Sequence, residues 1–425
     1  MTDLFEDLAY RGLIHQETDP EGLRKHCAGG SRVVYAGFDP TADSLTIGNL
    51  VPILLLRHFQ DAGHRPVVLV GGGTGLIGDP SGKEAERQLR TTEEIERNVA
   101  GQRRVFGKVL SFSGENAARI VNNADWLGKL SFLEALRDVG KHFSVNMMIQ
   151  KDSVRRRLEE REQGISYTEF SYMLLQAYDF QYLSDSLGVT IQLAGSDQWG
   201  NVVAGIELTR KTRQKELFGL TAPLVTKADG SKFGKSEAGA IWLTADRTSP
   251  YAFYQFWLGT LDADVERYLK IFTLLPRERI EALVAEHRAN PGARAAHRAL
   301  AAHVTELVHG ADAREQAEAA SAALFSGNVA GLSEATLDEV FATAPATEHA
   351  MSELAGEGTP LVDFLVAAGV AKSKREAREH LGSGAVSVNG VKMDPESRLV
   401  RAALLHDKVA LVRRGKKTWH VARFV

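Results

Sequence analysis

The chain has 425 residues and a formal net charge of −3. Its 44% of hydrophobic and 25% of charged residues are typical of ordinary globular proteins. This length predicts two or three domains, and no uncharged apolar run reaches the roughly 18–20 residues of a membrane span. The acidic N-terminus lacks a signal-peptide core, and the single cysteine, Cys27, excludes an internal disulfide framework. We therefore expect a cytoplasmic protein, and we expect no protein-bound metal because no Cys/His cluster has zinc spacing.

Charge is distributed unevenly along the chain. Residues 356–425 carry 13 Lys and Arg against 7 Asp and Glu, a net charge of +6, whereas the remaining 38 basic and 47 acidic residues give −9. This asymmetry predicts a small basic module, suited to binding a polyanion, on an acidic body.

The first part of the chain has the pattern of a parallel sheet. Residues 32–38 and 65–70 resemble buried strands, 50–59 has helical apolar spacing, and the Gly-rich residues 71–75 follow the second strand. Further elements are predicted as helices at 93–110, 130–138 and 170–182 and as a strand at 189–193. Since ligands of such sheets bind outside the carboxyl ends of the strands, we expect the functional site there.

The sequence pattern of the later part changes at residue 249 and again near residue 326. From 249 to 324 the pattern is helical, and the aromatic residues within 251–257 are expected to pack in its core. Residues 326–357 have weak periodicity, and a compact α+β module follows Pro360. The predicted domains are a Rossmann-like α/β domain at 1–225, a polar loop with an α-helical domain at 226–325, a linker at 326–357 and a basic α+β domain at 358–425.

Two distant stretches have the composition of a polyphosphate site. Thr46-Ile47-Gly48-Asn49 opens the helix at 50–59, where Gly48 would let a nucleotide approach the backbone. The side chains of Thr41, Thr46 and Asn49 offer neutral donors to phosphate oxygens. Each stretch also has a simpler interpretation: Thr46 as a helix cap, and the loop lysines described next as solvated surface charges.

The second stretch is a polar loop that carries Lys232, Lys235 and Ser236. Its glycine-spaced lysines are able to place two mobile cations on one triphosphate, and the loop is expected to close on ATP. A second basic loop, with Asp79, Lys83 and Arg87, follows the Gly-rich turn and could meet a leaving pyrophosphate.

Two further groups are expected at the carboxyl ends of strands. Asp197, two residues after Gly195, could accept both hydroxyls of a ribose. Tyr172, Gln176 and Asp179 lie at i, i+4 and i+7 of one helix and so share a polar face, which a bound amino acid could satisfy. Tyr35 of the first strand points toward the same crevice, and a purely structural hydrogen-bond network is the alternative.

Over essentially its whole length, the chain resembles the bacterial tyrosyl-tRNA synthetases, which are class I aminoacyl-tRNA synthetases. The resemblance rests on 35–45, 75–80, 140–146, the 168–180 helix, 195–201, and 232–236 as a form of the KMSKS motif. It implies that ATP activates tyrosine to tyrosyl-adenylate, which then charges the 3′ end of tRNA(Tyr). It also implies that Mg²⁺ accompanies the triphosphate and that the enzyme is a homodimer, for which 132–148 is a candidate interface or else core.

The resemblance also implies individual roles. Tyr35 and Asp179 would bind the phenol hydroxyl of tyrosine, while its ammonium and carboxylate would meet Asp79, Tyr172, Gln176 and Gln198. ATP would contact Gly37, Asp39, Gly48, Gly195, Asp197 and Lys235. The phosphates and the catalytic step would involve Thr41, Thr46, Asn49, Lys83, Arg87, Lys232, Lys235 and Ser236.

Two positions depart from the family pattern. Thr46 and Asn49 replace the histidines of the usual His-x-Gly-His tetrapeptide, and Ala36 stands where many relatives carry cysteine. The Thr-Ile-Gly-Asn form is similar to that of tryptophanyl enzymes. A tryptophan-activating enzyme, or a synthetase-like RNA-binding protein with weak activation, therefore stays an alternative, although Tyr35 with Asp179 argues against an indole substrate.

The C-terminal module is similar to an RNA-binding domain shared with a small-subunit ribosomal protein. We expect its tRNA-binding residues on one basic helix and at a hairpin tip, namely Lys374, Arg375, Arg378, Arg413, Arg414, Lys416 and Lys417.

Overall fold

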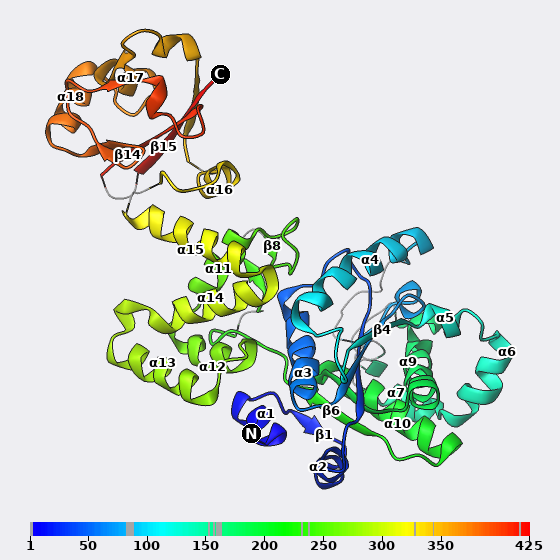
Figure 1. Ribbon diagram of the computed structural model, residues 1–425. Coiled ribbons are helices and arrows are strands. Elements are labelled where there is room, and N and C mark those ends of the chain that lie inside the picture. The colour runs from blue at the N-terminus through cyan, green and yellow to red at the C-terminus, as the bar shows by residue number, and fades with distance from the viewer. Residues whose placement is uncertain are drawn as a thin grey trace. The chain divides into compact units, whose positions relative to one another are not determined.

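The structure is a computed structural model that describes residues 3–81, 89–151, 154–155, 158, 164–230, 233–236, 239–326, 329–342, 344–415 and 418–425; for 235, 236, 324 and 325 only the backbone is described. The chain forms two compact units, Met1–Ser249 with Phe256–His309, and Pro250–Gln255 with Gly310–Val425 (Figure 1). Among the described residues, no helix is long and apolar enough to cross a membrane.

A six-stranded sheet in the order β1-β6-β5-β2-β3-β4 forms the centre of the first unit. Its strands are β1 (Gln16–Glu17), β2 (Val33–Phe38), β3 (Arg65–Val70), β4 (Arg119–Asn122), β5 (Val189–Gly195) and β6 (Phe218–Ala222). All neighbouring strands are parallel except the edge pair of β1 and β6. The predicted Rossmann-like parallel sheet is confirmed, with β4 and β6 as strands that the sequence pattern does not predict.

Helices cover this sheet on both faces. Helices α3 (Leu50–Asp61), α9 (Tyr167–Leu187) and α10 (Trp199–Arg213) pack against its strands, and the unit also contains α1 (Leu4–Arg11), α2 (Pro20–Ala28), α4 (Thr92–Val109), α5 (Ala124–Leu127), α6 (Phe132–Glu134) and α7 (Val145–Ile149). Val33 and Tyr35 of β2 pack with Phe180 of α9, and the intervening Val34 and Ala36 are equally buried. Successive residues of a strand point to opposite faces, so β2 is buried on both, and α3 and α9 flank the sheet in Figure 1.

Helix α9 carries the polar face predicted for amino-acid binding, and its ends are fixed locally. The Ser166 side chain caps the first turn by accepting a hydrogen bond from the backbone N–H of Glu169. Gly188 ends the helix with φ of 67°, a left-handed conformation that glycine adopts without strain. The chain can therefore turn directly into the start of β5, and Tyr172, Gln176 and Asp179 from earlier turns of α9 line the cavity at the carboxyl ends of the strands.

A helical bundle completes the first unit. It contains α12 (Asp262–Phe272), α13 (Arg277–Ala289) and α14 (Ala295–His309), preceded by α11 (Pro250–Leu258). Phe233 lies among aromatic rings of this bundle, with ring centroids 5.9 Å from Trp257 and 5.0 Å from both Tyr268 and Phe272. Phe233 thereby anchors the polar loop just before Lys235. The chain continues as two short antiparallel strands, β7 (Lys235–Ser236) and β8 (Gly239–Ala240).

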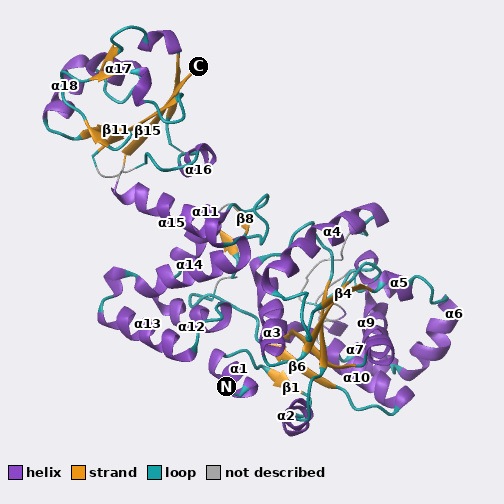
Figure 2. Cartoon of the chain, in the orientation of Figure 1, coloured by secondary structure: helices purple, strands orange, loops and turns teal. Residues whose placement is uncertain are grey.

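The second unit is built on a five-stranded sheet in the order β12-β11-β14-β15-β9 (Figure 2). Its elements are α15 (Ala311–Ser326), α16 (Glu334–Val340), β9 (Ala346–His349), β10 (Thr359–Pro360), α17 (Leu361–Ala367), α18 (Lys374–Gly382), β11 (Val386–Val388), β12 (Val391–Lys392), β13 (Arg398–Leu399), β14 (Val409–Arg414) and β15 (Thr418–Phe424). Val412 and Phe424 pack toward α17 and α18, whereas Leu411 and Val421 pack toward α15 and α16. The sheet is therefore buried on both faces.

The segment 326–357, expected to be a linker, contributes both α16 and β9 to this unit. β9 lies parallel to β15 at the edge of the sheet, with Ala346 opposite Val421. A pairing between strands so far apart in the chain leaves no local periodicity in the sequence, which is why the pattern there is weak.

Candidate active site

A cavity of about 480 Å³ lies at the carboxyl ends of β2, β3 and β5. This volume suits a small-molecule ligand, and the position follows the rule for parallel sheets. The predicted site residues that line it are Tyr35, Gly37, Asp39, Thr41, Thr46, Gly48, Asn49, Asp79, Tyr172, Gln176, Asp179, Gly195, Asp197 and Gln198. Lys83, Arg87 and Lys232 lie outside the described residues, and Lys235 and Ser236 are described by their backbone alone.

Asp179 and Tyr35 are deeply buried polar groups of the cavity, with exposed fractions of 1% and 0%. Asp179 accepts hydrogen bonds from Asn123 Nδ2 at 2.9 Å and from Trp126 Nε1 at 2.8 Å. The Tyr35 hydroxyl has no hydrogen-bond partner within the described part of the chain. A buried hydroxyl without a partner and a carboxylate held by two donors can together bind a ligand hydroxyl.

Burial also changes the ionisation of this pair. It raises the pKa of Asp179 to about 7, an effect that the hydrogen bonds from Asn123 and Trp126 oppose. Burial, together with the charge of Asp179, raises the pKa of Tyr35 well above its ordinary value. Near neutral pH, Tyr35 is therefore a hydrogen-bond donor, while Asp179 is divided between its two protonation states.

A second side of the cavity is acidic. Asp39 accepts hydrogen bonds from the hydroxyls of Tyr172 and Thr74, both at 2.8 Å. Burial raises the pKa of Tyr172 most, and the charges of Asp39, Asp79 and Asp179 raise it further. Three carboxylates thus lie near one phenol, and their combined potential suits an ammonium group.

A polar chain extends from this wall. Gln198 Nε2 donates to Asp79 at 2.7 Å, Asn201 Nδ2 donates to Gln198 Oε1 at 2.9 Å, and Lys151 Nζ donates to Asn201 Oδ1 at 2.7 Å. Burial lowers the pKa of Lys151 to about 7, and the charge of Asp79 opposes this shift. The carboxamide of Gln198, predicted to lie near a substrate carboxylate, is therefore oriented at both ends.

The glycines of the cavity differ in how much space the protein leaves for a side chain at each position. A Cβ built on Gly37 or Gly48 would have its nearest neighbour 3.9 Å away, so protein packing does not demand glycine there. At Gly195, a Cβ would lie 2.7 Å from Oδ1 of Asp197, so a side chain there would displace that carboxylate. Gly37 and Gly48 thus leave open backbone that a ligand can approach, and Gly195 leaves room for Asp197.

The structure brings the two proposed phosphate-binding stretches together. The backbone N–H of Ile47 donates to Ile241 O at 2.9 Å, and that of Ile241 donates to Gly234 O at 3.0 Å. Gly234 lies so close to Ile47 that a Cβ on it would be 2.7 Å from Ile47 Cγ2. The backbone of Lys235 therefore begins beside the turn that contains Gly48.

Thr46 and Asn49 cap this turn. The backbone N–H of Thr46 donates to Asn49 Oδ1 at 3.0 Å, and the Thr46 hydroxyl donates to the same oxygen at 2.9 Å. Thr46 is the N-cap of this turn, as the capping interpretation expects, and both residues also line the cavity. Neither residue carries a charge, unlike a protonated histidine.

Comparisons with known proteins agree along the whole chain. A family model for class I tRNA synthetases (W and Y) matches residues 29–326, and a model for the tyrosine–tRNA ligase SYY-like C-terminal domain matches residues 337–422. The chain is 52% identical to a tyrosine–tRNA ligase of Geobacillus kaustophilus (strain HTA426) over 425 residues, which covers 99% of this chain and 100% of that protein. The chain belongs to the tyrosine–tRNA ligase family.

Two further relatives extend the likeness. A tyrosine–tRNA ligase of Chromobacterium violaceum is 52% identical over 419 residues, 98% of each chain. The crystal structure of a C-terminally truncated mitochondrial tyrosyl-tRNA synthetase from Aspergillus nidulans has a TM-score of 0.69 at 31% identity, covering 76% of this chain and 95% of that one. The synthetase fold of the first unit thus has a solved counterpart.

The residues of the second unit that are predicted to bind tRNA lie in two groups. On α18, Lys374 pairs with Asp363 at 2.7 Å and Arg375 with Glu379 at 3.3 Å, and Arg378 is exposed. On the β14–β15 hairpin, the Arg413 guanidinium lies over the Trp419 ring and Arg414 donates to Val370 O at 2.9 Å. Lys416 and Lys417 are outside the described residues.

Sequence patterns miss several residues of the synthetase cavity. Asn123 and Trp126 hold Asp179 but follow β4, a short edge strand whose residues are only partly buried. Polar residues after a strand end are a usable signal only once the strand itself is recognised. Lys151 reaches the network from a segment without strand or helix periodicity. Gln192 is missed because it lies within the mostly apolar strand β5.

Proposed function

We propose that the chain works as a tyrosine–tRNA ligase whose substrate selection rests on Asp179 and Tyr35. The observation that carries this assignment is a buried carboxylate beside a phenol whose hydroxyl has no hydrogen-bond partner among the described residues, in a cavity also lined by Asp39 and Asp79. A tyrosine hydroxyl satisfies both groups, because it donates to the carboxylate and accepts from Tyr35. Phenylalanine and tryptophan have no hydroxyl for these groups and would leave them unpaired.

The acidic wall supports the remaining contacts of the amino acid. Asp79, Tyr172 and Gln176 bind its ammonium group, and Gln198 orients its carboxylate. That carboxylate is ionised at neutral pH, so one of its oxygens attacks the α-phosphorus of ATP without a general base. The new oxygen–phosphorus bond forms as the bond to pyrophosphate breaks, giving tyrosyl-adenylate. The terminal ribose hydroxyl of the tRNA then attacks the acyl carbon and releases AMP.

ATP binds along the glycines of the cavity, with Mg²⁺ on the triphosphate. Asp197 accepts the ribose hydroxyls beside Gly195, while Gly37, Asp39 and Gly48 lie along the nucleotide. Lys232, Lys235 and Ser236 stabilise the charge that develops on pyrophosphate, together with Thr41, Lys83 and Arg87. The contact of Gly234 with Ile47 supports this arrangement, because it brings the loop to the capped turn of Thr46 and Asn49.

The domains divide the work between activation and charging. Residues 1–225 form the catalytic domain, 226–325 the KMSKS-type loop and anticodon-side helices, and 358–425, together with α16 and β9 of 326–357, the RNA-binding domain. The enzyme acts in the cytoplasm as a homodimer. Apolar side chains exposed in the segment from α6 to α7 support the dimer, since Phe132, Leu133 and Val145 have exposed fractions of 66%, 76% and 57%.

Amino-acid-dependent exchange of labelled pyrophosphate into ATP tests this function. We expect exchange with tyrosine and almost none with phenylalanine or tryptophan at equal concentration. Exchange driven by tryptophan would identify a tryptophan-activating enzyme instead. If tRNA binds but no amino acid supports exchange, the chain is an RNA-binding protein rather than a ligase.

A further inference from the structure

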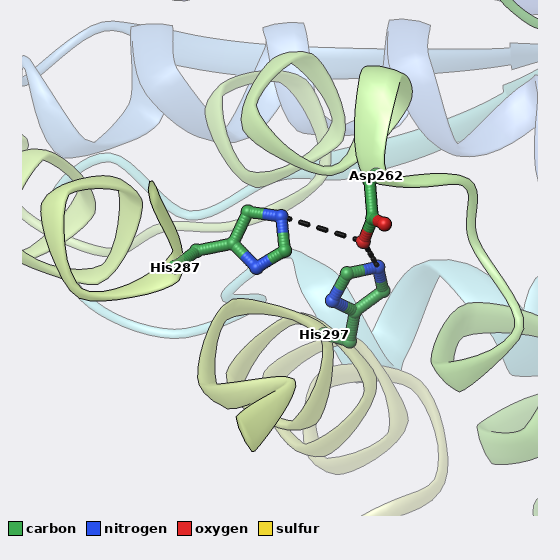
Figure 3. Close-up of side chains that lie close together, drawn as sticks. All are labelled: Asp262, His287 and His297. Carbon is green, nitrogen blue, oxygen red and sulfur yellow. Dashed lines mark ion pairs between the residues drawn. The ribbon is translucent and has the colours of Figure 1, made fainter. Parts of the chain in front are cut away.

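Three side chains that the synthetase reaction does not use converge in the helical bundle of the first unit. Asp262 begins α12, His287 lies in the last turn of α13, and His297 lies in the first turn of α14. Figure 3 shows both imidazole rings pointing a nitrogen at the same carboxylate oxygen of Asp262. The distances from Asp262 Oδ1 are 3.4 Å to His287 Nε2 and 3.3 Å to His297 Nε2.

Hydrogen bonding does not account well for this arrangement. Both distances exceed the usual 2.9 Å or so of an N–H···O bond, and neither ring nitrogen of His297 forms a hydrogen bond within the described part of the chain. The backbone of Thr260 lies near His297 without good hydrogen-bond geometry. His297 is nevertheless fully buried, where an unsatisfied polar group is costly. An Asp–His ion pair would satisfy one ring nitrogen of His297 at most, and the other would stay buried without a partner among the described residues.

The spacing fits a metal ion. Ligands at the Zn–N and Zn–O distances of about 2.0–2.1 Å in a tetrahedral site are separated by about 3.3–3.4 Å. The two Asp–His separations already have this value, and all three ligand atoms lie within 4.8 Å of one another. Two imidazoles with one carboxylate suit zinc and similar transition metals, whereas Mg²⁺ prefers oxygen ligands alone.

Exposure and charge are compatible with entry of an ion. The Asp262 side chain has an exposed fraction of 64%, so solvent can reach the cluster and supply a fourth ligand. Burial lowers the pKa of His297, and the nearby Arg294 lowers it further, which keeps its imidazole in the neutral form that binds metals. The charge of Arg294 also opposes a cation, and the Asp262 carboxylate offsets it.

We propose that Asp262, His287 and His297 form a binding site for a zinc-class divalent transition metal that ties together the ends of α12, α13 and α14. The site differs from the Mg²⁺ that accompanies ATP, both in its ligands and in its place in the fold. It also runs against the expectation of no protein-bound metal, which rested on ligand spacing along the chain. Here the ligands come from three helices, and that spacing carries no signal for them.

Titration of the untagged, full-length protein with Zn²⁺ or Co²⁺, in the absence of ATP, tests the site. We expect one ion per chain, visible absorption bands typical of four-coordinate Co²⁺, and a higher melting temperature with Zn²⁺. Asp262→Asn and His287→Gln should each weaken binding by more than about tenfold and abolish the thermal shift. Because Asp262 is exposed, its amide variant is expected to fold and to keep tyrosine-dependent exchange.

Asp61→Asn serves as the matched control, since Asp61 is also a half-exposed aspartate at a helix end but lies outside the cluster. It should bind Zn²⁺ like the unchanged protein. Two results would overturn the proposal: an unchanged protein that takes up no stoichiometric Zn²⁺ or Co²⁺, or Asp262→Asn and His287→Gln variants that bind the ion as tightly as the Asp61→Asn protein.

Discussion

The proposed amino-acid pocket and the proposed RNA-binding surface of the second unit differ in how far their charged groups are buried. In the pocket, Asp179 and Tyr35 are almost fully buried, and fixed donors hold the carboxylate. On α18, Arg375 is 90% exposed and is paired only with a neighbouring carboxylate. Buried groups gain strong, directional interactions and lose much when unpaired, whereas exposed ions gain little individually. Substitutions should therefore have large, specific effects in the pocket and small, salt-dependent effects on the surface.

The largest effect is expected for Asp179→Ala. This change removes the acceptor for the tyrosine hydroxyl and leaves the donors of Asn123 and Trp126 unpaired. We expect kcat/KM for tyrosine in pyrophosphate exchange to fall roughly 10²–10³-fold, and the preference over phenylalanine to fall with it. Steady-state exchange with each amino acid measures both quantities.

Asp185→Ala is the control for this substitution. Asp185 lies on the same helix, but it pairs at the surface with Arg213 and Lys215, both at 2.8 Å. Its replacement should leave tyrosine selectivity unchanged. The role assigned to Asp179 is wrong if its alanine variant folds, as judged by its circular dichroism spectrum, and still prefers tyrosine.

Next in size is Lys235→Ala. The backbone of Lys235 begins beside the Gly48 turn, so its side chain is expected to reach the triphosphate when the loop closes. Loss of a cation that acts mainly in the transition state should lower the rate of adenylate formation about 10²-fold, with tyrosine affinity nearly unchanged. Single-turnover kinetics and equilibrium tyrosine binding separate the two effects.

Lys215→Ala is the control for the loop lysine, because Lys215 forms a surface ion pair with Asp185. It should leave both the rate and the affinity unchanged. An equal loss of rate and tyrosine affinity in the Lys235 variant would mean that the residue supports the pocket rather than the transition state.

The sequence predicts this pocket better than it predicts the residues that support it. Strand β2 and helix α9 are long, strongly patterned and close to their predicted bounds, so Tyr35, Tyr172 and Asp179 can be placed on one crevice. The sequence does not predict Asn123 as a site residue, because the strand that precedes it, β4, is short and lies at the sheet edge. Contacts between segments far apart in the chain, which depend on tertiary packing, leave no local pattern.

The same limit affects the second unit. Weak periodicity at 326–357 indicates a linker, yet β9 completes the sheet there through a parallel pairing with β15. Removal of residues 356–425 would therefore take away the partner strand of β9 and expose the apolar residues of α15 and α16. Point substitutions are the cleaner test of tRNA binding, since they leave this sheet intact.

A smaller effect is expected from pH. We expect tyrosine to prefer the ionised form of Asp179, because the proposed hydrogen bond from its hydroxyl is stronger to a carboxylate than to a carboxylic acid, and burial raises the pKa of Asp179 to about 7. Protonation as the pH falls through this value should weaken tyrosine binding, by up to roughly eightfold between pH 7.5 and pH 6 for a single group. Equilibrium titrations with tyrosine across this range measure the change.

Phenylalanine binding provides the comparison for the effect of pH on tyrosine binding. Phenylalanine has no hydroxyl to donate, so its weak binding should lack this dependence on pH. A tyrosine affinity that is constant from pH 7.5 to pH 6 would contradict an ionised Asp179 as the acceptor.

The smallest effect is expected from single cations of the second unit, such as Arg378→Ala on α18. One exposed phosphate contact contributes little energy, so tRNA affinity should fall only about two- to fivefold at moderate salt. Because each neutralised phosphate releases counterions, the slope of log affinity against log salt should decrease by about one. Tyrosine-dependent exchange should not change, since every predicted tyrosine and ATP residue lies before residue 237.

Arg423→Ala provides the matched control, because Arg423 lies on β15 and pairs with Asp338 of α16 at 2.7 Å. It should leave both the affinity and the salt slope unaltered if α18 and the β14–β15 hairpin form the RNA-binding surface. Combining Arg378→Ala with Arg413→Ala should then add the two losses, since exposed Arg378 and half-buried Arg413 lie on separate elements, α18 and β14. A double variant with the tRNA affinity and salt slope of the unchanged protein would move the RNA-binding surface elsewhere, whereas a parallel loss of exchange would point to a folding defect.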